Sequence, residues 1–458
     1  MNPYARLRQE IARAAQELKR NKSTDPIRII GHLDADGISA SAILVKALMR
    51  LSKRYQLYTI QQLDSITLEM IDKQGNGPLI CVDIGSGQFS TLRNIVRKTR
   101  CIVLDHHELE EETKAENIIH INPHLFGING SKEISGAGIA YLFAEALDEN
   151  NMDLSYLGIV GAVGDGQDLK SELLKDILDK AKKSGMIEES YGIKLYGATT
   201  RPLHKVLEWS SDHPIPGLTG SENNCLAFLH ELGIKSREGN KWRSLSDLSE
   251  EEHQKLITGI IIRRSKHKDP YSILGKVYYL SKEPIGHTRD VREFCTLLNA
   301  CGRLNKASLG LGACLGDEKL KKKAIAQVEE YKKHVSEMMR WYETAKEEIK
   351  KEKGILIINA QDAVMQTMIG TLCSIVARSG KIEDGTVVIG LSRMPARLTK
   401  VSMRLVGSGH DLFRLATVAA EKVGGQAGGH KEAAGAIIPT ISEGDFIRIA
   451  TERIQRKR

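Results

Sequence analysis

Four polar clusters, each at the end of an apolar run, constrain the fold of this chain more than any other feature. Three of the runs, at residues 27–30, 79–82 and 102–104, have the length and β-branched composition of buried parallel strands. The clusters are HLDADG at 32–37, VDIG at 82–85, LDHHE at 104–108 and GDG at 164–166. In an open parallel sheet the carboxyl ends of the strands meet at one edge, where ligands bind. We therefore expect four strand ends to gather these side chains at one sheet edge.

The residue types in the clusters suit a pair of divalent cations. His32, Asp34 and Asp36 alternate, so an extended backbone would place them on one side. Imidazole and carboxylate ligands suit Mn²⁺ better than a thiolate-seeking ion, and Mg²⁺ or zinc stays open. Two ions about 3.5–4 Å apart need a shared carboxylate, for which Asp83 is the candidate. Such a pair lowers the pKa of a shared water to near neutrality, which favours phosphoester hydrolysis.

Each cluster has a simpler interpretation when it is taken alone. A single DxDG is most often a solvated turn, His106 and His107 can simply cap a strand, and Asp165 can end a helix. The prediction therefore depends on their co-occurrence. In that case His106 binds metal, His107 holds a substrate phosphate or a proton, and Asp165 adds a carboxylate beside glycines that permit close approach.

The length of 458 residues predicts several domains. Strand and helix alternate up to residue 168, which indicates a catalytic α/β domain with a parallel sheet over 1–168. Residues 169–316 are interpreted as a helical insert that completes this domain. Residues 317–353 carry apolar positions three or four apart among Lys and Glu, which predicts one long linker helix. A smaller, substrate-binding α/β domain is expected over 354–458.

The last of these regions contains a second group of candidate binding residues. Gly428 and Gly429 precede His430, and backbone amides in such a loop can cradle an anion. Ser402 and Arg404 share one face of a predicted strand. Three further basic residues lie nearby, namely Arg393, Arg397 and Lys400. A turn and a solvated strand face are the simpler interpretations, but together these groups could grip successive phosphates.

Composition limits the partners and the location. Lys and Arg outnumber Asp and Glu by 66 to 58, which allows a polyanionic partner without requiring one. Aromatic residues make up only 5% of the chain, so contacts to a nucleic-acid strand should depend on its backbone. No apolar run is long enough to span a bilayer, and the amino terminus lacks an apolar signal core. We therefore predict a cytoplasmic protein without a membrane partner.

The order of the motifs resembles that of the DHH phosphoesterase superfamily, named for the motif that is here Asp105, His106 and His107. The segment GGHKEAAG at 428–435 resembles the glycine-rich signature of the DHH-associated domain. HLDADG and VSMR at 401–404 are similar to RecJ-type single-strand exonucleases, and the length fits the archaeal branch that includes the GINS-associated nuclease. The resemblance is strong over residues 27–168 and 354–440.

The resemblance implies roles for the residues that match its motifs. The implied metal ligands are His32, Asp34, Asp36, Asp83, His106 and Asp165. Asp105 would be a ligand or would lie just behind the ligands, and His107 would contact the scissile phosphate. The nucleic-acid backbone would be bound by Ser402, Arg404, Gly428, Gly429 and His430.

Three functions stay open at this point. The first is a Mn²⁺-dependent exonuclease acting on single-stranded DNA or RNA in replication or repair. The second is a phosphoesterase for short oligonucleotides or cyclic dinucleotides. The third is a scaffold similar to the eukaryotic Cdc protein of the replicative helicase, which binds GINS without catalysis. GINS binding can also coexist with nuclease activity.

Overall fold

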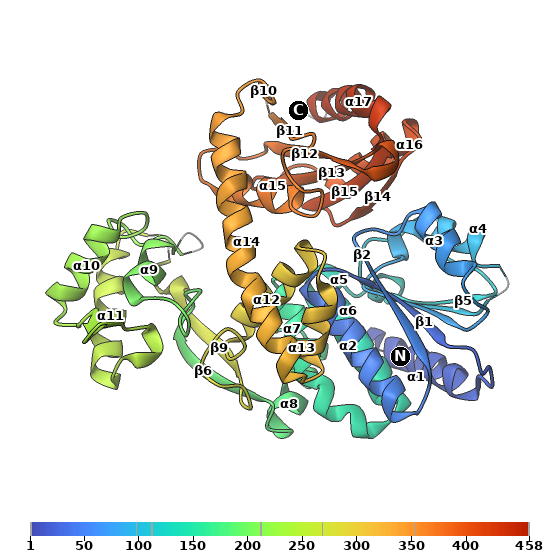
Figure 1. Ribbon diagram of the computed structural model, residues 1–458, viewed down its shortest axis with the longest axis horizontal. Coiled ribbons are helices and arrows are strands. Elements are labelled where there is room, and N and C mark those ends of the chain that lie inside the picture. Colours follow the sequence, from blue (N-terminus) through green and yellow to red (C-terminus); the bar gives the residue numbers. More distant parts are fainter. Residues whose placement is uncertain are drawn as a thin grey trace. The chain divides into compact units, whose positions relative to one another are not determined.

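Strand β1 (Ile27–His32) forms from the first predicted apolar run, and its first five residues are buried. It lies in a parallel sheet with the strand order β2-β1-β3-β4-β5. The other strands are β2 (Tyr55–Ile60), β3 (Leu79–Val82), β4 (Cys101–Leu104) and β5 (Ile118–Ile121). The computed structural model (Figure 1) describes residues 2–97, 99–110, 113–210, 213–267, 269–352 and 354–456.

Helices surround this sheet and pack through buried apolar side chains. The helices that follow in chain order are α1 (Pro3–Arg20), α2 (Ala35–Arg50), α3 (Ser65–Asp72), α4 (Phe89–Ile95), α5 (Gly130–Glu133), α6 (Gly136–Leu147), α7 (Ser155–Gly164) and α8 (Glu172–Lys183). The buried side chains lie on one face in α1 and on nearly all sides in α6. Side chains of α3 and α4 share one core with the strands. Helices α1, α2, α6 and α7 pack against one another. The motif residue Asp34 caps α2, because its side chain accepts a hydrogen bond from Gly37 N at 3.1 Å.

One motif lies on a helix where a strand end is expected. The run before Asp165 is α7, and Asp165 is its C-terminal cap. The sequence of α7 is apolar on nearly all sides, because seven of its residues are buried in the fold and need apolar side chains there. Periodicity cannot distinguish such a helix from a buried strand. The fourth polar cluster therefore reaches the site from a helix end.

A second sheet occupies the carboxyl-terminal region, with the strand order β10-β11-β12-β13-β15-β14. Its strands are β10 (Ile349–Glu352), β11 (Ile355–Asn359), β12 (Val387–Met394), β13 (Leu398–Leu405), β14 (Gln426–Gly429) and β15 (Ala433–Pro439). Strands β11 and β12 are parallel, and the other neighbours are antiparallel. The helices of this region are α15 (Ile369–Arg378), α16 (Leu412–Lys422) and α17 (Glu443–Arg456). The predicted fold class, two α/β domains with a parallel sheet in the first, is confirmed.

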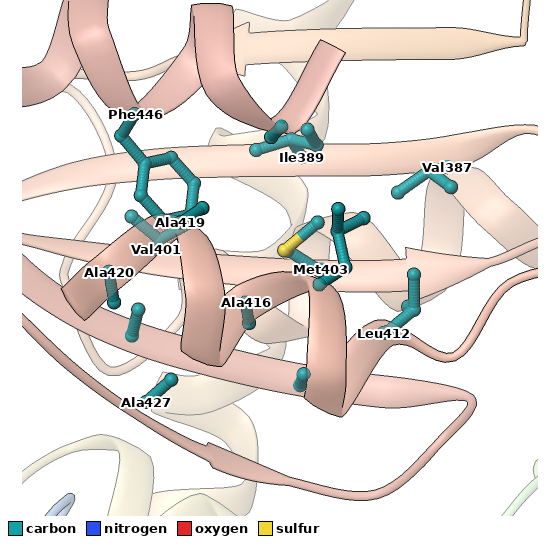
Figure 2. Close-up of a cluster of buried hydrophobic side chains, with 14 of the residues drawn as sticks. Val387, Ile389, Val401, Met403, Leu412, Ala416, Ala419, Ala420, Ala427 and Phe446 are labelled. Atoms are coloured by element: carbon teal, nitrogen blue, oxygen red, sulfur yellow. The ribbon is translucent and has the colours of Figure 1, made fainter. Parts of the chain in front are cut away.

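Small side chains allow α16 to approach this second sheet closely. Figure 2 shows Ala416, Ala419 and Ala420 facing Val401 and Met403 of β13. Phe446 of α17 enters the same core and is fully buried. The opposite face packs against α15 and the preceding long helix. The sheet is thus held rigid on both faces, which gives the side chains of β13 fixed positions.

The predicted linker helix is shorter than expected. Helix α14 (Glu318–Thr344) has 27 residues, and the chain then forms β10. Strand β10 pairs with β11 from Ile349↔Ile358 to Glu352↔Ile355. The pattern of residues 345–352 fits a helix or an edge strand, and pairing with β11 selects the strand. The predicted end of the helix, Lys353, lies outside the described residues.

Within the described residues the chain forms two compact units. The first combines Met1–Ile177 with Leu298–Arg458, and the second is Leu178–Leu297, green to yellow in Figure 1. The second unit contains α9 (Leu203–Glu208), α10 (Glu222–Glu231) and α11 (Glu250–Arg263) around a core of its own. It also contains the strand pairs β6 (Ile187–Ile193) with β9 (Leu274–Leu280) and β7 (Arg237–Glu238) with β8 (Lys241–Trp242), which the helical interpretation missed. Helices α12 (Val291–Arg303) and α13 (Ala307–Cys314) follow.

Among the described helices, none combines the length and the apolar character that crossing a membrane requires.

Candidate active site

The predicted metal ligands lie together, in two groups that meet at Asp83. In the first group, Nε2 of His106 lies 3.1 Å from Oδ2 of Asp165 and 3.2 Å from Oδ1 of Asp83. The Asp36 carboxylate comes within 3.6 Å of the same nitrogen. These side chains come from β4, β3, α2 and α7. The sheet edge and one helix end therefore assemble the first group.

The second group lies on the other side of the same aspartate. Nδ1 of His32 is 3.0 Å from Oδ2 of Asp34 and 3.4 Å from Oδ2 of Asp83. Burial alone would lower the pKa of His32, but the carboxylates of Asp34 and Asp83 raise it to about 10. Each oxygen of Asp83 thus faces a different histidine, at 3.4 Å for His32 and 3.2 Å for His106.

The donor atoms fit divalent cations. Three of them, His32 Nδ1, Asp83 Oδ1 and His106 Nε2, are buried and close to one another's groups, yet within the described part of the chain none makes a hydrogen bond of acceptable angle. Buried polar atoms are normally paired. Burial and the carboxylates of Asp83 and Asp165 also raise the pKa of Asp36 well above its ordinary value. Crowded carboxylates and imidazole nitrogens without a well-aligned hydrogen bond suit divalent ions such as Mn²⁺ or Mg²⁺, which these residues would hold.

The backbone at this site is shaped for the cluster. Asp83 has φ of 58°, in the left-handed region that costs a non-glycine residue about 1–3 kcal/mol. Helix α6 begins against Asp36, whose carboxylate accepts from Gly136 N at 2.7 Å and Ala137 N at 3.0 Å. A Cβ on Gly136 would lie 2.6 Å from Oδ1 of Asp83. Glycine at this position therefore permits the approach of α6, and nothing in the local sequence pattern pointed to it.

Asp105 holds the DHH segment rather than facing both metal groups. Its carboxylate accepts from Ser86 N at 2.8 Å, His106 N at 2.8 Å and His107 Nδ1 at 2.7 Å. Burial would raise the pKa of Asp105, but His107 and His106 keep it well below its ordinary value. These contacts favour the position behind the ligands for Asp105. The bond to His107 Nδ1 leaves Nε2 of His107 available to substrate.

Further polar contacts orient His106, and the sequence contained no signal for them. Nδ1 of His106 lies 2.9 Å from Gly130 O, an oxygen that also accepts from Gln167 Nε2 at 3.0 Å. If Nδ1 carries the proton, Nε2 is free to bind a cation. The Asn122 side chain donates to Ser86 Oγ at 2.8 Å and to His107 O at 2.9 Å. Asn122 and Gln167 therefore stabilise the geometry of the two histidines.

A cleft of about 960 Å³ extends from the two groups of predicted metal ligands to the second sheet. The predicted substrate-binding residues Ser402, Arg404, Gly428, Gly429 and His430 all line it. The ring of His430 stacks on His107 with 4.6 Å between centroids, and its Nδ1 lies 3.1 Å from Ser131 Oγ. Burial beside His107 and His106 lowers the pKa of His430 to about 2, so this ring is neutral. The two motif regions, more than 300 residues apart in the sequence, thus share one cleft.

One wall of the cleft carries three cations, of which Lys400 is buried and Arg404 and Arg303 are half-buried. Lys400 and Arg404 lie on β13, and Arg303 lies at the end of α12. Their hydrogen bonds go to neutral groups: Lys400 Nζ to Gln62 Oε1 at 2.6 Å, Arg404 Nε to Ser374 Oγ at 2.9 Å, and Arg303 Nη1 to Thr367 O at 3.2 Å. In the described ranges none of the three has an acidic partner within ion-pair distance. Because an uncompensated buried charge is costly, this wall is suited to an anion.

Two of the basic residues predicted nearby do not line the cleft. Arg393 forms an ion pair with Asp362 at 3.3 Å on the surface, and Arg397 lies in the turn between β12 and β13. Arg303, by contrast, does line the cleft.

Three family models match this chain. They are the DHH family N-terminal domain at residues 26–161, the DHH-CID domain at 195–274 and the DHHA1 domain at 355–456. An uncharacterized protein of Methanocaldococcus jannaschii is 32% identical over 442 residues, which covers 93% of each chain. The chain belongs to the DHH superfamily and is RecJ-like.

Similar proteins extend this assignment. The single-stranded-DNA-specific exonuclease RecJ of Thermus thermophilus is 26% identical over 176 residues, so the match spans 36% of this chain and 25% of that protein. Exonuclease RecJ bound to manganese has the same fold, with a TM-score of 0.56, 16% identity, and coverage of 98% and 94% of the two chains. CDC45 from Entamoeba histolytica also shares the fold, with a TM-score of 0.64 and 12% identity over 97% and 99% of the chains.

Membership in this superfamily and the donor set together support a phosphoesterase that depends on divalent metal ions. In this RecJ-like chain, predicted metal ligands and three basic residues line the same cleft. Such an arrangement can hold a phosphodiester between the two.

Proposed function

We propose that this chain is an exonuclease that hydrolyses phosphodiester bonds of single-stranded DNA or RNA from one end. The observation that carries the proposal is the cleft. Four of the six proposed metal ligands line it, namely His32, Asp34, Asp83 and Asp165, and so do Arg303, Lys400 and Arg404, which have no acidic partner at ion-pair distance among the described residues. A single phosphate at the metal groups would leave those cations unpaired. A strand, which carries one phosphate per nucleotide, satisfies both walls at once.

The roles within this proposal follow from the contacts. Two divalent cations, Mn²⁺ first and Mg²⁺ as the alternative, would be held by His32, Asp34, Asp36, Asp83, His106 and Asp165. When bound, they would lower the pKa of a water and neutralise charge on the reacting phosphate. His107, oriented by Asp105, would give a proton from Nε2 to the leaving oxygen. Ser402, Arg404 and the loop at Gly428, Gly429 and His430 would hold the neighbouring phosphates.

The names of two relatives support a strand as the substrate. RecJ of Thermus thermophilus and a putative prophage-derived exonuclease of Bacillus subtilis are both called single-strand DNA-specific. We extend that substrate class to this chain and add single-stranded RNA as a second substrate. We also propose that the protein acts in the cytoplasm, in DNA replication or repair.

The test is digestion of single strands labelled at the 5′ or the 3′ end, with Mn²⁺ present. An exonuclease releases labelled mononucleotides at once from one of the two substrates and shortens the other stepwise. A duplex of the same sequence serves as the control and should resist digestion. Rapid hydrolysis of a dinucleotide without digestion of the long strand would instead establish the small-molecule phosphoesterase.

A scaffold function is the second candidate, favoured by the fold shared with CDC45. The grouping of all six predicted metal ligands argues against a purely structural role. Binding of GINS or other components of the replicative helicase can accompany catalysis. To test that partner, purified GINS subunits would be captured by the full chain. The comparison is a full chain with surface substitutions in its second unit.

Lys400 leads to a prediction about pH. Burial, together with Arg303 and Arg404, lowers the pKa of Lys400 to about 7. The ammonium group therefore loses its proton, and its attraction for phosphate, as the pH rises through neutrality. Affinity for a strand should fall about tenfold between about pH 6 and 8, the size of one charged hydrogen bond. Fluorescence anisotropy in EDTA, where no strand is cut, measures this change.

Lys400→Arg is the matched variant, because its guanidinium stays protonated throughout that range. The pH dependence should become flatter in this variant. The exposed Lys422→Arg is the control and should keep the wild-type dependence. An equally steep fall in Lys400→Arg would contradict the prediction.

A further inference from the structure

Aromatic and basic side chains from both ends of α9 form a stack in the second unit. Cζ of Arg201 lies 4.6 Å from the ring centroid of Tyr196 and 4.6 Å from that of Trp209. Gly197, with φ of 85°, makes room for it, because a Cβ there would lie 2.5 Å from Cδ of Arg201. We call Tyr196, Arg201 and Trp209 the Trp209 stack. Among the described residues, rings and not an acid hold its guanidinium in place.

The same short helix carries a second aromatic contact. Cζ of Arg237 lies 3.6 Å from the ring centroid of Trp242, whose ring is 4.3 Å from that of His204 on α9. The hairpin that contains Trp242 is bonded to the helix start through Leu203 N and Arg243 O at 2.8 Å. Two of the three tryptophans of the chain therefore lie beside α9, each in contact with an arginine.

The Trp209 stack is open to solvent and positively charged. Trp209 is 52% exposed, which is unusual for so large an apolar ring. The nearby acids Glu208 and Glu222 are both paired with Lys205, at 2.8 Å and 2.7 Å. Within the described ranges, neither Arg201 nor Arg237 has an acidic partner at ion-pair distance. The surface thus offers an exposed indole face and two cations to a ligand.

We propose that the Trp209 stack is a second binding site for single-stranded nucleic acid, outside the cleft. Trp209 stacks on a base, while Arg201 and Arg237 contact phosphates. A strand alternates flat bases with anionic phosphates, and this surface alternates flat rings with cations. Because the rings already order Arg201, little side-chain entropy is lost on binding. The inference rests on the proposed function for its ligand class. It adds a site that increases the affinity for a strand and takes no part in hydrolysis.

The test measures the affinity of the full chain for fluorescein-labelled oligothymidylate of about 30 nucleotides, by anisotropy in EDTA. Trp209→Ala should weaken binding about tenfold, within the range for loss of one base stack. Trp209→Phe keeps a ring and should stay within about threefold of wild type. The control is Tyr191→Ala on β6, which removes a ring that is 72% exposed and lies outside the stack.

A second readout separates this site from the cleft. Hydrolysis of a dinucleotide, which occupies the cleft alone, should be unchanged in Trp209→Ala. Unchanged strand affinity in a Trp209→Ala protein with wild-type thermal unfolding would overturn the proposal, as expected if the surface served a protein partner. An equal loss in Tyr191→Ala would overturn it too. If the wild type binds strands through Trp209 yet cuts none, the nuclease proposal fails and the stack stands.

Discussion

Replacing Asp83 by asparagine is expected to reduce strand hydrolysis by at least about 1000-fold, since losing a partner behind the ligands already costs 10–100-fold. Each oxygen of Asp83 faces a different histidine, at 3.2 Å for His106 and 3.4 Å for His32. The amide keeps the shape but loses the charge that two cations would share. Asparagine also tolerates the left-handed backbone at φ of 58°, where alanine would add strain. The effect can therefore be assigned to the missing carboxylate.

Calorimetric titration with Mn²⁺ and thermal unfolding provide the second readout for Asp83→Asn. A ligand at 100 times its Kd stabilises the folded state by about 2.7 kcal/mol, so Mn²⁺ should raise the Tm of the wild type. That increase should be largely lost in the variant. Asp168→Asn is the matched control, because Asp168 is exposed and pairs only with Lys170, at 2.9 Å, among the described ion pairs. Full Mn²⁺ binding with near-normal hydrolysis in Asp83→Asn would contradict the proposed centre.

Replacing His107 by asparagine is expected to lower kcat about 10²- to 10⁴-fold, the usual range for a general acid or base. Nδ1 of His107 is bound to Asp105 at 2.7 Å, and the ring stacks on His430 beside the cleft. Nδ1 of His107 lies 3.9 Å from Asp83 Oδ1, farther than the nitrogens of His106 and His32, and it is already bound to Asp105, so we expect His107 to transfer a proton and not to hold the metal. The affinity for Mn²⁺ should therefore stay within about threefold of the wild type.

Two further variants sharpen this prediction. Asp105→Asn should lower both kcat and Mn²⁺ affinity, because its amide cannot accept all the bonds that orient His106 and His107. His230→Asn, on the surface of α10, should change neither. If His107→Asn lost Mn²⁺ as completely as Asp83→Asn, His107 would be a metal ligand and the proton donor would have to be sought elsewhere.

Much of the candidate site was predictable from local sequence. Strands β1, β3 and β4 are short apolar runs, and polar residues follow each of them directly. Parallel neighbours must end at the same edge, so the proximity of His32, Asp83 and His106 follows from the strand assignments alone. Local patterns also indicated an anion site at β13 and the glycine loop. The role of these residues in binding a nucleic-acid backbone, however, came from resemblance to a family.

Local patterns were insufficient where two structures fit the same residues. The apolar run before Asp165 suits a buried helix as well as a strand, and packing against α2 and α6 selects the helix. Residues 345–352 could have continued α14, but pairing with β11 selects an edge strand. In both places the competing local preferences are similar in size, so tertiary contacts determine the outcome.

The sequence by itself determined the α/β architecture and the residue types of the metal centre, because apolar runs and the polar residues after them are neighbours along the chain. Only the tertiary structure decided which cations face that centre. Arg303 and Lys400 lie about 100 residues apart, and each could have found an acid on the surface. Their position in the cleft, with no acidic partner at ion-pair distance among the described residues, is a property of surroundings built from distant segments, and so is the exposure of Trp209 beside Arg201. No local pattern records those surroundings.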